Sequence, residues 1–280
     1  MASGPLLDVR NLRVTFDTRK GPVEAVRGVS FALGREKLGI VGESGSGKSQ
    51  TGRSILGLTP PPGRVEADTV TFAGRDLTRA SAAEMRAIRG KRISMVMQDP
   101  KFSLNPVMRV GDQIVEAFQA HDGTSPAAAR TEALEMLKAV RIRDPERVMR
   151  AFPHEVSGGM GQRIMIAMML APDPDILIAD EPTSALDVTV QLQVLAILDD
   201  LVTQRGMGLI FISHDLPLVA TFCDRVLVMY AGRIVEEVAA KDLDAAKHPY
   251  TRGLMNCLPR LDDRHRALPV LERDPAWLDA

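Results

Sequence analysis

The stretch GESGSGKSQ, residues 42–50, contains three glycines, three serines and one lysine, and it has too little apolar surface to pack in a core. It matches the pattern G-x-x-x-x-G-K-[ST] at Gly42, Gly47, Lys48 and Ser49. The apolar run LGIV (38–41) precedes it and a predicted helix over SQTGRSILGL (49–58) follows it, which is the context that the pattern requires and that a Gly/Ser linker lacks. The stretch therefore predicts a loop that wraps a nucleotide's phosphates, with backbone N–H groups turned inward. The predicted ATP-binding residues of this loop are Gly42, Glu43, Ser44, Gly45, Ser46, Gly47, Lys48, Ser49 and Gln50.

Two further apolar runs end in polar residues. DILIA (175–179) leads into Asp180 and Glu181, and GLIFIS (208–213) leads into His214. Apolar runs without alternation are typical of strands in a parallel sheet that is covered on both faces, and ligands collect at the carboxyl ends of such strands. We expect Asp180 and Ser49 to hold Mg²⁺ and Glu181 to act as the base that accepts a proton from the attacking water. The alternative is that the two carboxylates only start a helix before Pro182.

The remainder of the chain predicts two other kinds of structure. Residues 7–17 and 23–33 alternate in part and are separated by Lys20-Gly21-Pro22, which favours antiparallel strands. A helical pattern covers residues 111–156, with Ser125-Pro126 as a helix start. An apolar stripe on this helix contains Ala133, Leu134, Leu137 and Val140. The tail after Val238 mixes charges with prolines and is expected to be a loose extension, which Leu258 and Leu261 dock.

Composition excludes several classes of partner. The 280 residues are 45% hydrophobic and 25% charged, and the formal net charge of -1 provides no basic field for nucleic acid or for an anionic membrane surface. The longest apolar run, Ile164 to Ala171, is far shorter than the roughly 20 residues of a membrane-spanning helix. The N-terminus lacks the features of a secretion signal. Cys223 and Cys257 form no metal or disulfide pattern, so we expect two inert thiols in a reducing cytosol.

A further group of motifs is not required by phosphate binding alone. VSGGMGQR (156–163), SALD (184–187), Gln98 and His214 follow the loop and Asp180-Glu181 in a set order. Together these segments resemble the ATP-binding cassette ATPases of ABC transporters over about the first 240 residues. The resemblance implies an α/β fold, with a P-loop NTPase RecA-like core around a parallel sheet, an N-terminal antiparallel β-subdomain and an inserted helical subdomain. It implies a cassette over residues 1–240, with the helical part at about 100–163, and a C-terminal extension over 241–280.

The resemblance also implies a head-to-tail dimer with ATP held between two cassettes. The phosphate-binding loop of one cassette faces Ser157, Gly158 and Gly159 of the other. These residues precede the helical run MGQRIMIAMML, so their N–H groups and the helix N-terminus are suited to a γ-phosphate. Neither cassette encloses the nucleotide alone.

Other residues take roles from the family. Gln98 corresponds to the glutamine that senses Mg²⁺ and the attacking water and links the site to the membrane subunits. His214 corresponds to the histidine that contacts the γ-phosphate, and Asp187 to the aspartate of a loop that crosses the dimer interface. Phe16 lies where the family places an aromatic ring against adenine, although Phe31 is an alternative. The expected catalytic residues are therefore Glu181, His214 and Gln98, and Gln98 joins Ser49 and Asp180 at the metal.

Finer detail is similar to the importers of oligopeptides, dipeptides and nickel. The segments that carry this likeness are MQDPKFSLNPVMRVGDQI (97–114), VSGGMGQRIMIAM (156–168) and HPYTRGL (248–254). The likeness implies the first of two cassettes, which pairs with a second, homologous ABC ATPase as a heterodimer. It also implies two integral membrane permeases, an extracytoplasmic substrate-binding protein, no nucleic-acid partner, and a peripheral position on the cytoplasmic face of the inner membrane. The transported solute stays open among peptides, nickel, opines and related compounds.

The sequence differs from the family's usual motifs at several positions. Gly161 stands where the family often has arginine, and Gln50 where it often has threonine or valine. The tail has one cysteine, Cys257, where larger relatives use several to hold an iron–sulfur cluster, so we expect no cluster. The rivals are a cassette that acts on DNA or ribosomes, a regulatory subunit that binds ATP without hydrolysing it, and a small-molecule kinase.

Overall fold

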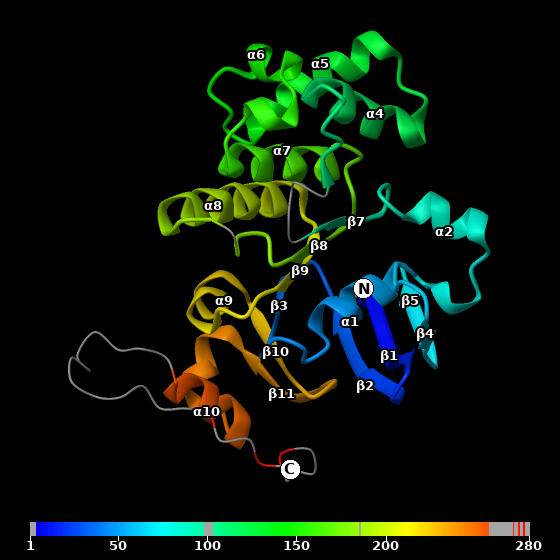
Figure 1. Cartoon of the computed structure of the whole chain (residues 1–280), viewed down its shortest axis with the longest axis vertical. Helices are drawn as coiled ribbons and strands as arrows, with labels where there is room; N and C mark the ends of the chain where they lie inside the picture. The colour runs from blue at the N-terminus through cyan, green and yellow to red at the C-terminus, as the bar shows by residue number, and fades with distance from the viewer. Residues whose placement is uncertain are drawn as a thin grey trace. The chain divides into compact units, whose positions relative to one another are not determined.

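The computed structural model describes residues 4–97, 103–184 and 186–257 and the single positions 271, 274 and 277 (Figure 1). The chain divides into two compact units. The first contains residues 1–78 and 211–280, and the second contains residues 79–210. The division therefore falls within strand β9 (Gly208–Ile212).

An antiparallel sheet begins the first unit. The two expected strands are confirmed as β1 (Leu7–Thr18) and β2 (Gly21–Leu33), which pair along their whole length. The predicted turn at Lys20-Gly21-Pro22 is shifted, because Gly21 and Pro22 already belong to β2. Three short strands extend the sheet, two of them against β1. They are β4 (Gly63–Glu66), β5 (Thr69–Phe72) and β6 (Arg75–Asp76), and the 3₁₀ helix η1 (Leu77–Arg79) follows.

The second group of strands in this unit carries the phosphate-binding loop. The run LGIV forms β3 (Lys37–Val41), which pairs in parallel with β10 (Arg225–Tyr230), and β10 pairs in antiparallel with β11 (Arg233–Ala239). Helix α1 (Lys48–Ile55) follows the loop, and α9 (Leu216–Phe222) packs on β3 so closely that a Cβ at Gly39 would lie 2.3 Å from Val219. The SγH group of Cys223 is buried beside it, and burial raises the pKa of this thiol to about 12. Cys223 is therefore buried, as the sequence predicts, and its inertness stays a prediction.

The tail is more ordered than its composition predicts. After β11 the chain forms the 3₁₀ helix η3 (Ala240–Ala245) and helix α10 (Pro249–Asn256), drawn in orange in Figure 1. Tyr250 and Thr251 of α10 are fully buried, so the expectation of a loose extension is wrong for residues 240–257. Pro249 occupies the first turn of α10, where proline starts a helix rather than breaking it. Leu258 and Leu261, the predicted docking pair, lie outside the described residues.

The second unit combines two parallel strands with a group of helices. The strands are β7 (Ile93–Val96) and β8 (Ile176–Asp180), and β8 confirms the predicted run at 175–179. The helices are α2 (Ala82–Ile88), α4 (Val110–Asp122), α5 (Pro126–Ala139), α6 (Pro145–Arg150), η2 (Pro153–Glu155), α7 (Gly158–Leu170) and α8 (Val188–Arg205). Helices α7 and α8 pack side by side, as Figure 1 shows.

Helix α5 confirms the helix start and the apolar stripe that the sequence predicts. The hydroxyl of Ser125 accepts a hydrogen bond from the N–H of Ala128 at 3.3 Å and so caps the helix, and Pro126 follows as its first residue. The predicted stripe is buried at Ala133, Leu137 and Val140 and half-buried at Leu134. The stripe faces neighbouring helices of the same unit, which include α4 and α7. Among the described residues, every helix is too short or too polar to cross a lipid bilayer.

Candidate functional site

The loop between β3 and α1 is shaped by glycines that have no room for a side chain. Gly42 and Gly47 adopt φ values of +150° and +102°, in the region that favours glycine. A Cβ at Gly42 would lie 2.1 Å from the backbone oxygen of Met229, and a Cβ at Gly47 would lie 2.3 Å from that of Ala25. Because β2 and β10 approach the loop so closely, only glycine allows the backbone to turn here.

Lys48 lies at the centre of this loop. Its side chain is 5% exposed, and its Nζ donates hydrogen bonds of 2.8 Å to the backbone oxygens of Gly42 and Glu43. These bonds fix the ammonium group inside the loop's curve. Gly47 is the N-cap of α1 and has no side chain to occupy the first N–H groups of the helix. A buried cation beside a helix N-terminus is a suitable environment for a phosphate group.

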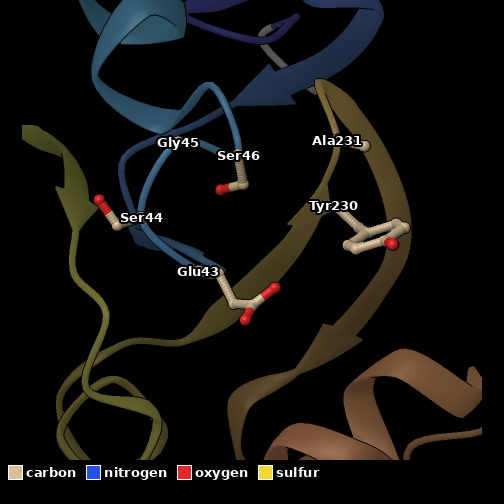
Figure 2. A pocket seen from close by; sticks show the side chains of 6 residues that line it. All are labelled: Glu43, Ser44, Gly45, Ser46, Tyr230 and Ala231. Carbon is tan, nitrogen blue, oxygen red and sulfur yellow. The ribbon is translucent and has the colours of Figure 1, made fainter. Parts of the chain in front are cut away.

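The loop is also held from its outer side. The N–H of Gly232, in the turn between β10 and β11, donates to the backbone oxygen of Ser46 at 3.0 Å. A cavity of about 170 Å³ lies between the loop and β10. Figure 2 shows Glu43 on the loop and Tyr230 on β10, with the Glu43 side chain extending toward Tyr230. The residues that line this cavity are Glu43, Ser44, Gly45, Ser46, Tyr230 and Ala231.

The first unit also contains the aromatic and histidine residues that the sequence singles out. Phe16 is half-buried in β1, whereas Phe31 is 4% exposed and part of the core, so Phe16 is the more accessible of the two rings. His214 is exposed in the turn after β9. The preceding residue, Ser213, donates its N–H to the backbone oxygen of Ile40 in β3 at 3.1 Å. The turn that carries His214 thus lies beside the strand that leads into the phosphate-binding loop.

Asp180 and Glu181 end strand β8 in the second unit. Asp180 is 1% exposed, and Glu181 is half-buried with φ +47°, a conformation that costs a non-glycine residue free energy and often marks functional sites. The backbone oxygen of Glu181 accepts from the N–H and the hydroxyl of Ser184, at 3.3 and 3.2 Å. Residues 181–184 form a turn, and α8 begins only at Val188. The alternative that the two carboxylates start a helix is therefore wrong.

The segment Ser157 to Gly159 forms the start of α7. The hydroxyl of Ser157 accepts a hydrogen bond from the N–H of Met160 at 3.4 Å, and Ser157 and Gly158 are exposed. The sequence places both glycines before the helix, but they belong to its first turn, because Ser157 is the N-cap. The Nε of Arg163 donates to the backbone oxygen of Gly159 at 3.2 Å and fixes this turn.

Asp187 lies beside that turn. Its carboxylate accepts a hydrogen bond from the N–H of Val190 at 3.0 Å and caps α8. A Cβ at Gly159 would lie 2.6 Å from Val190, so the first turns of α7 and α8 are in direct contact. The structure brings Ser157–Gly159 and Asp187 together on one face of the second unit.

The structure does not test the predicted role of Gln98 or the predicted magnesium site. Gln98 lies outside the described residues, and so does Ala185 of the SALD segment. Ser49 and Asp180 belong to different units, so a magnesium site that they share stays a prediction. Among the described residues, no group of three or more histidine, cysteine or acidic side chains forms a metal site.

Sequence reasoning missed the residues that support the loop from behind. Ala25, Met229 and Gly232 contact it through backbone atoms, which leave no pattern in the sequence. Tyr250 also contacts it, since its hydroxyl oxygen lies 3.0 Å from the backbone nitrogen of Glu43. The motif HPYTRGL contains this tyrosine, but the sequence alone shows no reason to place it beside residue 43.

Gly47→Ala is expected to destabilise the protein and to prevent phosphate binding. The methyl group meets the Ala25 oxygen and forces an L-residue to φ +102°, which together cost about 2–4 kcal/mol. Thermal unfolding and nucleotide binding of the full chain measure the effect. Gly45→Ala is the control, because Gly45 has φ +82° but an added Cβ meets nothing within 4 Å. Equal melting temperatures for the two variants would contradict the role of this close contact.

Comparison with known proteins adds to this geometry. The family described as "ABC transporter" matches residues 26–184. The chain is 53% identical over 270 residues to a protein named as a probable peptide ABC transporter ATP-binding protein, y4tR of Sinorhizobium fredii, and the match covers 95% of this chain and 81% of that protein. It is 50% identical to the dipeptide transport ATP-binding protein DppD of Bacillus subtilis, over 96% of this chain and 82% of that protein.

Among solved structures, the chain is similar to the ATP-binding cassette MJ0796, whose structure is titled as a dimeric post-hydrolysis state bound to ADP and Pi. The TM-score is 0.74 and the sequence identity is 27%, and the match covers 84% of this chain and 98% of that one.

Proposed function

The chain belongs to the ABC transporter family of ATP-binding proteins, and from this membership we propose that it is the ATP-hydrolysing subunit of an importer for peptides or related small solutes. The observation that carries the proposal is the glycine loop with the buried Lys48 at its centre, in a chain that also has the exposed Ser157–Gly158 turn. The first can hold a triphosphate, and the second can close over the triphosphate of another cassette.

The proposed active centre is divided between two subunits. The loop Gly42–Gln50 of this chain binds the phosphates of one ATP, and Phe16 contacts the adenine. The turn Ser157–Gly159 of the partner presents N–H groups and a helix N-terminus to the γ-phosphate. The exposure of Ser157 and Gly158 supports this arrangement, because a turn buried within its own subunit is not available to another.

The second unit supplies the proposed hydrolytic groups. Glu181 accepts a proton from the attacking water, and His214 from the first unit contacts the γ-phosphate. Gln98 and Asp187 connect the site to the membrane subunits and to the dimer interface. Hydroxyl and carboxylate oxygens suit Mg²⁺, so Ser49 and Asp180, with Gln98, are the residues that would hold it. The ion would neutralise charge on the β- and γ-phosphates.

The proposed assembly follows from the family. An importer ATPase of this family works as a dimer with membrane permeases. We propose that the partner cassette is a second, homologous ATPase and that a substrate-binding protein outside the membrane delivers the solute. The cassette over residues 1–240, with its helical subdomain at about 100–163, then lies on the cytoplasmic face of the inner membrane. Closure of the cassettes on ATP moves the permeases, so the solute never touches this chain.

The test is transport by the reconstituted system. The full chain, the permeases, the second ATPase and the binding protein from the neighbouring genes are incorporated into liposomes, with a radiolabelled dipeptide outside. Uptake is expected with enclosed MgATP and not with MgADP, accompanied by phosphate release. ATP binding without phosphate release would favour the regulatory-subunit alternative, and uptake that is equal with ADP would overturn the proposal.

A further inference from the structure

The chain has two tyrosines and one tryptophan, and all three lie in one cluster. The rings of Tyr230 and Tyr250 have centroids 4.5 Å apart, and Trp277 lies 5.7 Å from each of them. Tyr250 is fully buried. The cluster joins strand β10, helix α10 and a position near the end of the chain, and it lies next to the phosphate-binding loop.

Tyr250 is the member of this cluster that reaches the loop. Its hydroxyl accepts a hydrogen bond of 3.0 Å from the backbone N–H of Glu43. The backbone oxygen of Glu43 accepts a hydrogen bond from Lys48 Nζ at 2.8 Å. Glu43 is therefore held on both sides, by Tyr250 at its N–H and by the phosphate-binding lysine at its carbonyl.

The position of Tyr250 is itself fixed by hydrogen bonds at the start of α10. The carboxylate of Glu236 in β11 accepts from the N–H groups of Lys247 and His248, at 2.6 and 3.2 Å. The Nδ1 of His248 accepts from the N–H of Tyr250 at 3.2 Å. A helix tied to a strand in this way holds the tyrosine ring in one place, so its hydroxyl is pre-arranged for the Glu43 peptide.

We propose that Tyr250 is a positioning residue for ATP binding, because its hydroxyl holds the Glu43 peptide and, through it, the loop and Lys48 in the phosphate-binding conformation. The inference rests on the proposed function. A loop that is already ordered loses less conformational entropy when the ligand binds, so the bond is expected to raise affinity for ATP. Glu43 is not a reacting group, and the rate of hydrolysis at saturating ATP is expected to stay the same. The HPYTRGL segment thus acts on the nucleotide site from the opposite end of the chain.

A purely structural role for Tyr250 makes a different prediction. If the ring only fills space beside Tyr230 and Trp277, Tyr250→Phe keeps all of that packing and leaves ATP binding unchanged. Removal of the hydroxyl separates the two roles, since it deletes the acceptor for the Glu43 N–H and keeps the aromatic ring. Tyr230→Phe is the matched control, because it removes a hydroxyl from the same cluster and leaves the bond between Tyr250 and Glu43 intact.

The experiment measures MgATP binding to the full chain by calorimetry, together with the KM and kcat of the reconstituted importer. Tyr250→Phe is expected to bind MgATP about 3- to 10-fold more weakly, in line with the loss of one hydrogen bond, and to raise KM with kcat unchanged. Tyr230→Phe is expected to match the wild type within about twofold, because the described hydrogen bond to the loop comes from Tyr250 and is kept in this variant. Equal dissociation constants for Tyr250→Phe and the wild type would overturn the inference. Failure of the wild type to bind MgATP would instead overturn the proposed function.

Amide hydrogen exchange tests the same inference with two different variants, so that it does not rest on Tyr250→Phe alone. Amide hydrogen exchange of a peptide that contains Glu43 is expected to be faster in Tyr250→Phe than in the wild type and in Tyr230→Phe. Glu236→Ala, which removes the acceptor that anchors α10, is expected to have the same effect and also to weaken MgATP binding. If exchange at Glu43 is the same in all four proteins, Tyr250 does not position the loop.

Discussion

Glu181→Gln is expected to bind MgATP as tightly as the wild type but to hydrolyse it about 10²- to 10⁴-fold more slowly, which is the usual contribution of a general base. The amide has the same shape as the carboxylate but cannot accept the proton of the attacking water. The left-handed backbone at residue 181 and the turn to Ser184 do not depend on the side-chain charge, so the fold is expected to stay intact. Phosphate release by the assembled importer gives the rate, and calorimetry of the full chain gives the affinity.

Glu132→Gln provides the control for this result. Glu132 is an exposed residue of α5 in the same unit, so its substitution makes the same change of charge away from the proposed base. We expect wild-type hydrolysis from this control. A Glu181→Gln variant that releases phosphate at more than a tenth of the wild-type rate would show that another group accepts the proton.

The features that the sequence predicted well depend on local patterns. The run LGIV is too apolar to lie anywhere but the interior, and β3 is buried at Leu38 to Val41. Ser125-Pro126 predicts a helix start because a hydroxyl acceptor and a fixed φ satisfy the first turn without help from the rest of the chain. The glycines of the loop belong to the same class, since the φ values they adopt are open to few other residues.

The features that the sequence did not predict depend on contacts between distant segments. Tyr250 and Glu43 are 207 positions apart, and the backbone N–H that joins them is common to almost every residue. The tail shows the same limit. Its charges and prolines suggest a loose segment, but its aromatic rings pack with one another and with Tyr230 of β10. Asp187 shows a third limit of the sequence. Its carboxylate caps helix α8, and the same residue is a candidate for the dimer interface, but the motif alone does not reveal the capping role.

Gly158→Asp is expected to leave ATP binding to this chain unchanged and to lower hydrolysis by the assembled importer about 10²- to 10³-fold, the range seen when a group that stabilises developing charge is lost. A Cβ at Gly158 meets nothing within 4 Å, and a carboxylate in the first turn of a helix is favourable, so the variant is expected to fold. In the divided site, however, the new negative charge faces the γ-phosphate on the partner cassette and prevents closure. The effect therefore appears only in the assembly.

The control is Ala127→Asp, which introduces the same charge at an exposed position in the first turn of α5. It lies in the same unit as Gly158 and outside the proposed interface, so hydrolysis is expected to match the wild type. Nucleotide binding by the separate chain and phosphate release by the assembly are measured for both variants. If Gly158→Asp hydrolyses ATP in the assembly as fast as Ala127→Asp does, the Ser157–Gly159 turn does not face a nucleotide, and the divided active centre is wrong.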